Sequence, residues 1–68
     1  MIGDVDFDGS VTVSDALIVM RHASGLDTLT GDALIAADVD GDGVVTQDDA
    51  TTIMQYSAGL ITVFPIEA

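Results

Sequence analysis

The sequence predicts a small all-α fold in which two loop–helix repeats, related by pseudo-twofold symmetry, are joined by a short connecting helix. Residues 4–26 align with residues 38–60 at twelve identical positions out of 23. Each copy begins with a loop rich in aspartate and glycine and continues into a stretch with helix start and stop signals. Solenoids need about three units and capping repeats, so two copies predict a pair packed face to face.

The chain of 68 residues predicts a single domain, and a core of this size usually needs an additional staple. Hydrophobic residues make up 49% of the sequence, so a core can form despite the acidic composition. Cysteine is absent, which leaves a metal or association as the staple. Within 1–68, the predicted divisions are repeat one at 4–26, the connecting helix at 30–37, repeat two at 38–60 and a tail at 61–68.

The helix of each repeat has recognisable ends. In the first repeat, Ser14 and Asp15 open a helix that runs through Ala23 and stops near Gly25, a residue suited to the left-handed position after a helix. In the second, Asp48 and Asp49 open a helix that ends at Gly59. Acidic residues in the first turn also suit the helix dipole.

The segment between the repeats and the tail are predicted from shorter signals. Thr30 is expected to cap a short helix that continues up to Asp38. Residues 61–65 of the tail are expected to be extended because they are rich in β-branched residues and contain Pro65. We expect Ile2, Phe64 and Pro65 to clasp the two ends of the chain together.

The two repeat helices present an apolar stripe with helical spacing, which predicts a shared core. The stripe consists of Ala16, Val19, Met20 and Ala23 in the first helix and of Ala50, Ile53, Met54 and Ser57 in the second. Val13, Leu17 and Ile18 lie on another face of the first helix. A partner protein, the connecting helix or the tail could cover this second face.

The loops at 4–15 and 38–49 fit a calcium-binding pattern with oxygen ligands at positions 1, 3, 5, 7, 9 and 12 and glycine at position 6. Alternate carboxylates of a tight loop can turn towards one centre, and the last one returns on the first turn of the helix. The predicted carboxylate ligands are Asp4, Asp6, Asp8 and Asp15, then Asp38, Asp40, Asp42 and Asp49. Ser10 and Val44 would contribute backbone oxygens, and Thr12 and Thr46 would act through water.

All-oxygen sites of this kind favour hard cations, and calcium tolerates irregular coordination better than magnesium. The sequence therefore predicts two bound Ca²⁺ ions. The closing residue is aspartate where glutamate is common, so its shorter arm must bring the helix closer or bind with fewer oxygens. A single loop of this composition could be a solvated turn, but two complete loops at equal spacing favour metal sites.

The charge of the chain supports this prediction. Twelve acidic residues stand against one arginine, which gives a formal charge of −11. Eight of the twelve acids lie at ligand positions, and two calcium ions would add four positive charges and bring −11 to −7. Metal binding is therefore expected to be coupled to folding. The charge also argues against binding to nucleic acid or to anionic membrane surfaces.

The sequence contains neither a membrane-spanning segment nor a signal-peptide pattern. No run of about 18 apolar residues is present, so no membrane span is expected. The first residues lack a signal-peptide pattern, and we interpret the sequence as a module of a longer chain.

The whole chain resembles a type I dockerin, with two calcium-binding F-hand repeats. Only three residues precede the first loop, so the helix that enters an ordinary EF-hand has no room. The matching motifs are Gly-Asp-Val-Asp-Phe-Asp-Gly at 3–9, Asp-Val-Asp-Gly-Asp-Gly at 38–43, and the helix ends Ser-Gly-Leu and Ala-Gly-Leu.

The resemblance implies a docking function. A dockerin binds a cohesin domain in a calcium-dependent manner and anchors a secreted enzyme or scaffold subunit to a multi-enzyme complex, the cellulosome, which degrades plant cell-wall polysaccharides. It also implies an extracellular or cell-surface location, and the free module is expected to be a monomer.

The resemblance further implies which residues contact the partner. These are Val13, Ser14, Leu17 and Arg21 in the first repeat, with the adjacent Ile18, and Gln47, Asp48, Thr51 and Gln55 in the second. The first set is apolar with a cation, whereas the second is polar with an acid. This difference argues against two equivalent binding orientations.

The sequence fits other functions less well than docking. A calcium buffer or sensor would share the loops but would need entering helices, and a structural spacer would bind no cohesin. Enzyme activity is not expected, because the chain lacks cysteine, a serine–histidine pair within reach and a concave pocket. His22 is assigned to packing or surface, and Phe7 to an exposed or lid-like position.

Overall fold

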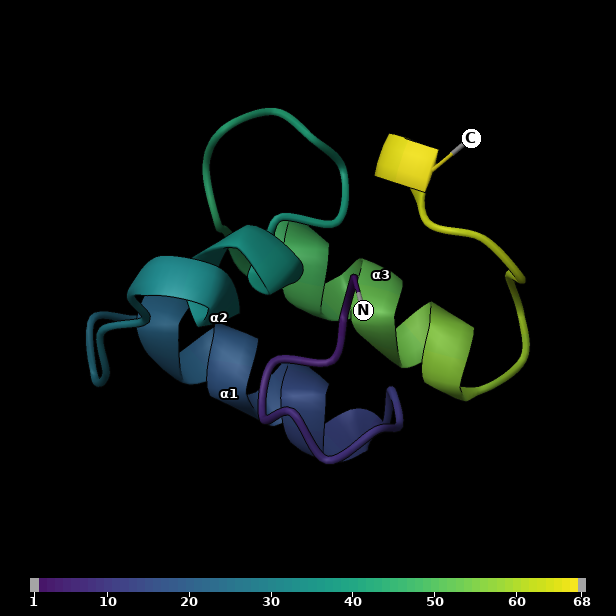
Figure 1. The fold of residues 1–68 in the computed structure, drawn as a ribbon, viewed down its shortest axis with the longest axis horizontal. Coiled ribbons are helices and arrows are strands. Elements are labelled where there is room, and N and C mark those ends of the chain that lie inside the picture. Colours follow the sequence, from purple (N-terminus) through teal and green to yellow (C-terminus); the bar gives the residue numbers. More distant parts are fainter. Residues whose placement is uncertain (1, 68) are drawn as a thin grey trace.

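The computed structural model describes residues 2–67, and these form an all-α fold without strands. The elements are α1 (Val13–Ala23), α2 (Gly31–Ala37), α3 (Gln47–Ser57) and a 3₁₀ turn, η1 (Pro65–Glu67). Figure 1 shows α1 and α3 as the two longer helices, with α2 crossing near α1. The predicted fold class, two loop–helix units joined by a short helix, is confirmed.

Both repeat helices begin slightly earlier than the sequence predicted. α1 starts at Val13 after the N-cap Thr12, and α3 starts at Gln47 after the N-cap Thr46. The reason is a capping box, in which the aspartate at the third helical position accepts a hydrogen bond from the backbone of the capping threonine. The aspartates predicted to open the helices thus lie inside the first turn.

Both helices end in the same way, and α3 stops two residues before the predicted end. The amide of Leu26 donates to the Arg21 carbonyl at 2.9 Å, and the amide of Leu60 donates to the Gln55 carbonyl at 2.9 Å. The residue before each leucine is a glycine with a φ of about 80°. Gly59 therefore lies after the helix, in the left-handed position that leucine or alanine would adopt at a cost.

The core lies between α1 and α3 and is completed by the tail. Its largest fully buried apolar side chains are Phe64, Ile53, Val19 and Val39. Ala16, Ala50, Val19 and Ile53 face the core as predicted, and Met20 packs against it. The prediction for Met54 was wrong, because this residue is 40% exposed.

The tail bends back over the domain, and the prediction of an extended stretch was wrong at Pro65, which begins η1. Phe64 is 1% exposed and stacks on Tyr56, with ring centroids 4.5 Å apart. It also lies against the α-carbon of Gly3, where a β-carbon would be 2.6 Å from Cζ of Phe64. Burial of this ring turns the chain into η1, which begins at Pro65.

These contacts confirm that Phe64 clasps the two chain ends together. Ile2 takes part by packing against the core, whereas Pro65 is exposed.

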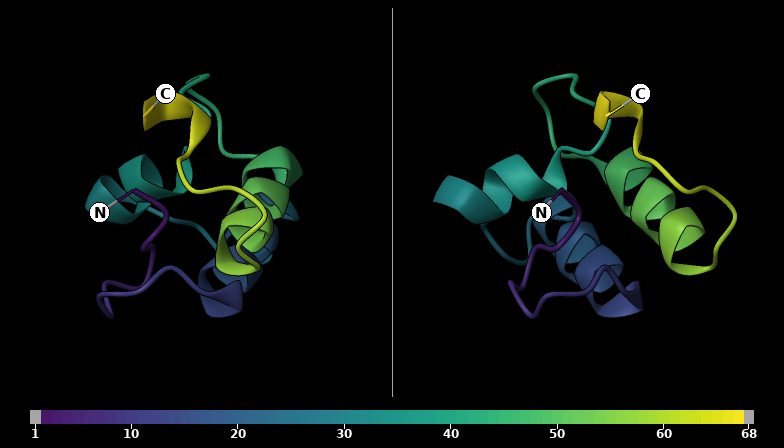
Figure 2. Two further views of the ribbon diagram at one scale, coloured as in Figure 1. Left: turned by 90° about the vertical axis from the view of Figure 1, so that its right-hand side faces the viewer. Right: turned by 45° about the vertical axis from the view of Figure 1, so that its right-hand side comes forward.

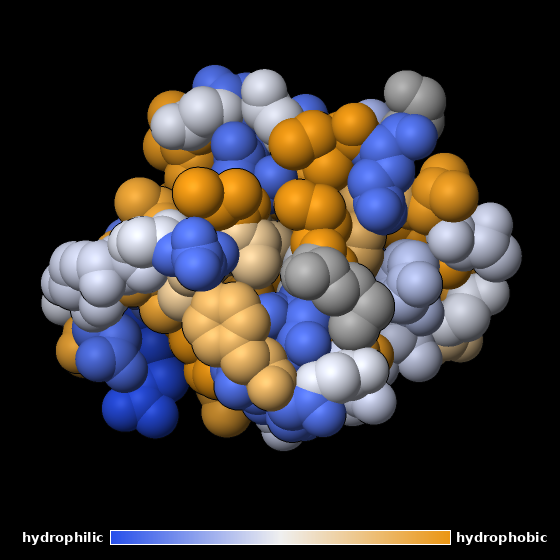
Figure 3. All heavy atoms as spheres, in the orientation of Figure 1, coloured by the Kyte–Doolittle hydropathy of each residue, from blue (hydrophilic) through white to orange (hydrophobic). Residues whose placement is uncertain are grey.

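The elements form two sides. α1 and α3 lie together on one side, while α2, the N-terminal segment and the tail lie on the other (Figure 2). On the side facing the viewer in Figure 3, apolar side chains gather between α2 and the C-terminal turn. In the described part of the chain, no helix has the length and apolar character needed to cross a bilayer.

Candidate metal centres

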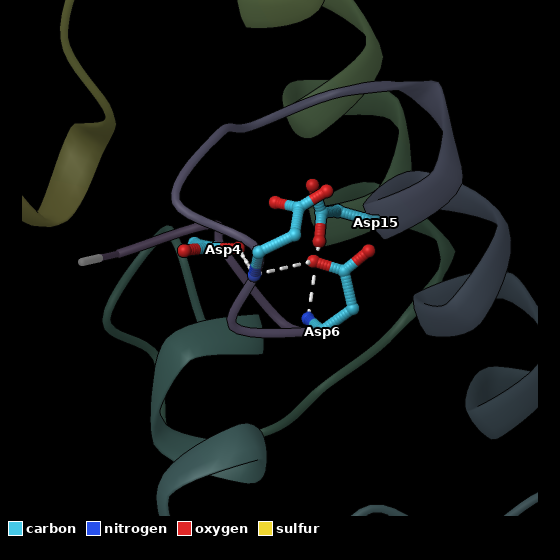
Figure 4. Close-up of side chains that lie close together, drawn as sticks. Asp4, Asp6 and Asp15 are labelled. Carbon is cyan, nitrogen blue, oxygen red and sulfur yellow. Dashed lines mark hydrogen bonds between the residues drawn. The ribbon is translucent and has the colours of Figure 1, made fainter.

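Two clusters of four carboxylates form where the loops meet the helices. Within each cluster, one ligand atom per residue lies within 4.8 Å of the corresponding atoms of the others. The clusters consist of Asp4, Asp6, Asp8 and Asp15 and of Asp38, Asp40, Asp42 and Asp49. Figure 4 shows three carboxylates of the first cluster, which come from the loop and from the first turn of α1. The structure thus brings together every aspartate predicted at a ligand position.

The closing aspartates join each helix to the start of its own loop. In the first repeat, Asp15 Oδ1 accepts hydrogen bonds from the amides of Val5 and Asp6, at 2.9 and 3.2 Å, and Oδ2 accepts one from Thr12 at 2.8 Å. In the second, Asp49 accepts from Val39 and Thr46, at 3.1 and 2.9 Å. Both side chains are fully buried. The short aspartate arm is accommodated because the loop folds directly over the helix start.

The opening aspartates differ between the two loops. Both oxygens of Asp4 accept amide hydrogen bonds, from Asp8 at 3.2 Å and from Gly9 at 3.0 Å. In the second loop, Asp38 Oδ2 accepts from Gly43 at 3.0 Å, but the buried Oδ1 has no hydrogen-bond partner among the described residues. A buried oxygen without a donor costs free energy that a cation would relieve.

The loop backbone requires left-handed conformations at two positions. The glycine at position 6 has a φ of 91° in Gly9 and 84° in Gly43. Position 4 is also left-handed, with a φ of 58° at Phe7 and 73° at Gly41. Glycine adopts this conformation freely, whereas phenylalanine does so at some cost. Phe7 is largely exposed, as predicted.

Loss of hydration and hydrogen bonding shift the pKa values of the loop carboxylates in opposite directions. Partial loss of hydration raises the pKa of Asp6 to about 6, and the nearby Asp15 carboxylate adds to this effect. The hydrogen bond from the Asp8 amide acts in the opposite direction and lowers this pKa. Partial loss of hydration, with neighbouring carboxylates including Asp38, likewise raises the pKa of Asp40 to about 6.

Two other loop carboxylates are shifted the opposite way. The Val44 amide hydrogen bond is the largest cause that lowers the pKa of Asp42. Loss of hydration would raise the pKa of Asp4, but hydrogen bonds from Gly9, Asp6 and Asp8 outweigh it and hold that pKa below its usual value.

The donor set fits a hard divalent cation. Each cluster offers carboxylate oxygens only, which favours calcium or magnesium over the softer transition metals. Loss of hydration is the main cause of the raised pKa values of Asp6 and Asp40, and repulsion from Asp15 and Asp49, which a cation would offset, adds to it. When bound, such an ion supplies positive charge at the junction of loop and helix. The residues around it orient the loop and bury the closing carboxylate.

The residues predicted to contact a partner on α1 are mostly exposed. Val13 and Leu17 are 60% and 54% exposed, and Ser14 is exposed as well. Arg21 is exposed and lies 3.5 Å from Asp27, between Nε and Oδ2. Ile18 is half-buried and packs against the core, which accounts for part of its apolar surface.

The corresponding residues of α3 are exposed and polar. Gln47, Asp48, Thr51 and Gln55 all lie at the surface. The Gln47 side chain donates to Ser24 Oγ at 3.2 Å, which connects the start of α3 with the end of α1. Thr51 donates its hydroxyl proton to the Gln47 carbonyl at 3.1 Å, so this hydroxyl is partly engaged by its own helix.

Two strongly exposed leucines were not among the predicted partner residues. Leu26 and Leu60 are 76% and 74% exposed, and each follows the glycine that ends a repeat helix. Their identity at equivalent positions of the two repeats was the available signal. His22 also has a structural role, since its Nδ1 accepts a hydrogen bond from the Leu29 amide at 3.0 Å.

Comparison with known proteins agrees with this geometry. Residues 2–56 match the dockerin type I domain, so the chain belongs to the dockerin type I family. This is a family of docking modules that bind calcium. The comparison with curated protein sequences finds no match.

Among solved structures, the chain is similar to two variants of the ScaB dockerin from Acetivibrio cellulolyticus, each in complex with the third cohesin of ScaC. The variant mutated in its N-terminal helix shares 36% identity with a TM-score of 0.94, covering 98% of this chain and 94% of that one. The variant mutated in its C-terminal helix shares 37% identity with a TM-score of 0.94, covering 100% and 97%. A Clostridium thermocellum dockerin in complex with the OlpC cohesin shares 33% identity with a TM-score of 0.82, covering 96% of both chains.

Proposed function

We propose that this chain is a calcium-dependent docking module that binds a cohesin domain and thereby anchors a secreted enzyme or scaffold subunit to a multi-enzyme complex. The observation that carries the proposal is the pair of four-carboxylate clusters, each built on a loop that leads into a helix. The similar dockerins were solved with cohesins bound, which supports the choice of partner. The proposed location is extracellular or at the cell surface.

The proposed calcium ligands are the eight clustered aspartates, the backbone oxygens of Ser10 and Val44, and Thr12 and Thr46 through water. The two threonines also cap α1 and α3, and the closing aspartates lie in the first turns of these helices. Calcium at either loop would therefore fix where a helix begins and how the loop lies over it. Because α1 and α3 pack on each other, ordering the loops would order the docking face as well.

The proposed docking face consists of the exposed residues of α1 and α3. On α1, the exposed side chains of Val13 and Leu17 form an apolar area beside Arg21. Exposed apolar area of this kind on a small domain supports a protein partner. The proposed cohesin-contacting residues are Val13, Ser14, Leu17, Ile18 and Arg21 on α1 and Gln47, Asp48, Thr51 and Gln55 on α3.

A docking module is favoured over a calcium sensor by the match to the dockerin type I family and by the similarity to dockerins solved with cohesins. Among the described residues, the first loop is followed by a helix but not preceded by one, whereas the second loop lies between α2 and α3. A sensor opens a groove by changing the angle between its entering and exiting helices. We therefore propose that calcium here stabilises one fold instead of switching between two.

The proposal is tested by titrating the module with a panel of cohesins of several types in calcium and again in excess chelator, using isothermal calorimetry. We expect binding to at least one type I cohesin in calcium and none in chelator. Circular dichroism of the module alone provides the control, with helical signal expected to fall when calcium is removed. Binding that persists in chelator, or calcium-saturated module that binds no cohesin of the panel, would contradict the proposal.

A further inference from the structure

The C-terminal turn contacts the second acidic loop through Ile66. The Ile66 amide donates to the Val39 carbonyl at 3.0 Å. Its side chain covers the α-carbon of Gly41, where an added β-carbon would lie 3.0 Å from Ile66 Cγ1. Val39 and Gly41 alternate along the loop with the clustered carboxylates of Asp38, Asp40 and Asp42. The turn therefore holds the segment of the loop that carries three of its four carboxylates.

The tail meets the first loop differently. Phe64 contacts Gly3, the residue just before that loop begins. The residue equivalent to Gly41 is Phe7, which is 59% exposed. The contact made by Ile66 therefore distinguishes the second loop from the first.

The second loop also has fewer hydrogen bonds of its own. In the first loop, the amide of Asp6 donates to Asp15, and the amide of Asp8 donates to Asp4. Among the described residues, the amides of Asp40 and Asp42 make no corresponding bonds to Asp49 and Asp38. Glycine at position 4 adds backbone freedom to the second loop. The second loop is thus less ordered by its own contacts than the first.

We propose that Ile66 is a positioning residue for the second calcium loop and that its contact raises the calcium affinity of that loop selectively. This inference depends on the proposed function, in which both loops bind calcium. A loop that is already held near its binding geometry loses less conformational entropy when the ion binds. Without the Ile66 side chain, the backbone around Gly41 gains freedom, and ordering its carboxylates costs more.

The substitution Ile66→Ala tests this inference in the full 68-residue chain. Calcium is titrated while the amide signals of Gly9 and Gly43 are followed by NMR. Each of these amides donates to the first aspartate of its own loop at 3.0 Å, so each reports on one loop. We expect the calcium concentration at half-saturation to rise about fivefold at Gly43. This is less than the tenfold or greater loss seen for hydrogen-bonded outer-shell partners.

The Gly9 signal serves as the internal reference, and its calcium concentration at half-saturation should change by less than about twofold. Val63→Ala is the matched control, because Val63 lies on the same tail, is 53% exposed and is outside the core cluster. Ile66→Val should raise the calcium concentration at half-saturation of the Gly43 signal by a smaller factor. This milder variant replaces Ile66→Ala in the test if the alanine variant folds poorly.

The outcomes separate this inference from the proposed function. If both loops of the unsubstituted chain bind calcium but Ile66→Ala leaves the Gly43 titration unchanged, or shifts Gly9 and Gly43 equally, Ile66 is not a positioning residue and the proposed function stands. If the unsubstituted chain shows no calcium-dependent change at either glycine, both proposals are overturned.

Discussion

Asp15 and Val5 are joined by a hydrogen bond that connects the start of α1 to the start of its own loop. The Val5 amide donates to Asp15 Oδ1 at 2.9 Å, and the equivalent bond from Val39 to Asp49 measures 3.1 Å. One carboxylate thus serves as a helix-capping group, as a loop anchor and as a proposed metal ligand. This triple role lets a domain with so small a core hold each loop against the start of its helix.

Asp15→Asn is expected to abolish calcium binding at the first loop and to destabilise the fold. The amide side chain loses the negative charge and presents an NH₂ group to backbone amides that need an acceptor, which costs about 1–3 kcal/mol for each buried group left unpaired. We expect at least about a hundredfold weaker calcium binding at that loop, measured by calorimetry.

The control for this substitution is Asp27→Asn. Asp27 is acidic and exposed, and it pairs with Arg21 outside the clusters. The substitution Asp27→Asn should change the calcium affinity by less than about twofold, because an exposed ion pair contributes little to stability. Equal calcium affinities for the Asp15 and Asp27 variants would remove Asp15 from the ligand set.

Calcium binding should weaken as the pH falls through about 6. The pKa values of Asp6 and Asp40 are raised to about 6, so both carboxylates take up a proton below that pH and must release it before an ion can bind. We expect calcium affinity to fall about tenfold at each loop between pH 7 and pH 5, measured by calorimetry. The variant Asp27→Asn should show the same pH dependence, and a pH-independent affinity would contradict the assignment.

The same shifts predict how the calcium-free chain responds to pH. A carboxyl whose pKa is higher when folded holds its proton more tightly in the folded state. Its contribution to stability is therefore complete below the unfolded value of 3.8 and is lost as the pH rises to about 6. In calcium-free buffer, the helical circular dichroism signal should increase as the pH is lowered from 7 to 4. Replacing Asp6 and Asp40 together with asparagine should flatten this response.

Phe64→Ala should destabilise the calcium-loaded domain by about 3–5 kcal/mol, because it removes a large buried ring together with its stacking on Tyr56. Urea unfolding at saturating calcium, followed by circular dichroism, measures the loss. Val63→Ala, one residue earlier and exposed, should cost less than about 0.5 kcal/mol. A loss below about 1 kcal/mol for Phe64→Ala would show that the tail does not complete the core in solution.

Leu17→Ala and Arg21→Ala should weaken cohesin binding more than Thr51→Ala and Gln55→Ala. The first pair lies on the apolar, cationic side of the proposed docking face, where a partner would cover the exposed Leu17 and where arginine is a frequent hot-spot residue. We expect losses of about fivefold or more for the α1 variants and about twofold or less for the α3 variants, measured by calorimetry. Equal losses from both helices would indicate that the two repeats contribute alike.

Most of the fold was predictable because the information is local. Loop length, alternate aspartates and glycine at position 6 lie within twelve consecutive residues, and each helix has its start and stop signals beside it. Boundaries were less accurate, since Thr12 and Thr46 cap the helices while the following aspartates lie inside them. Either residue type can cap a helix, and the loop geometry decided between them.

Which apolar side chains of α1 and α3 are buried and which are exposed could be seen only in the tertiary structure. Met20 and Met54 occupy equivalent positions of the repeats, yet Met20 packs against the core and Met54 is exposed. Ile18, expected on a second face of α1, is half-buried against the core. Burial of such residues depends on which neighbouring segment covers them. The repeats do not predict this, because the tail lies outside both repeats and has no symmetric counterpart.

The sequence by itself determined the two acidic loops, the helices that follow them and the family to which the chain belongs, because ligand spacing and helix signals act over a few neighbouring residues. The sequence also indicated that Phe64 joins the two chain ends, but the tertiary structure alone decided which residues the tail contacts and that it ends in η1. Phe64 is buried by Tyr56 and Gly3, and Ile66 reaches Gly41, through contacts between segments far apart in the chain. Such contacts depend on the shape that the packed helices and loops present to the tail, and no local pattern encodes that shape.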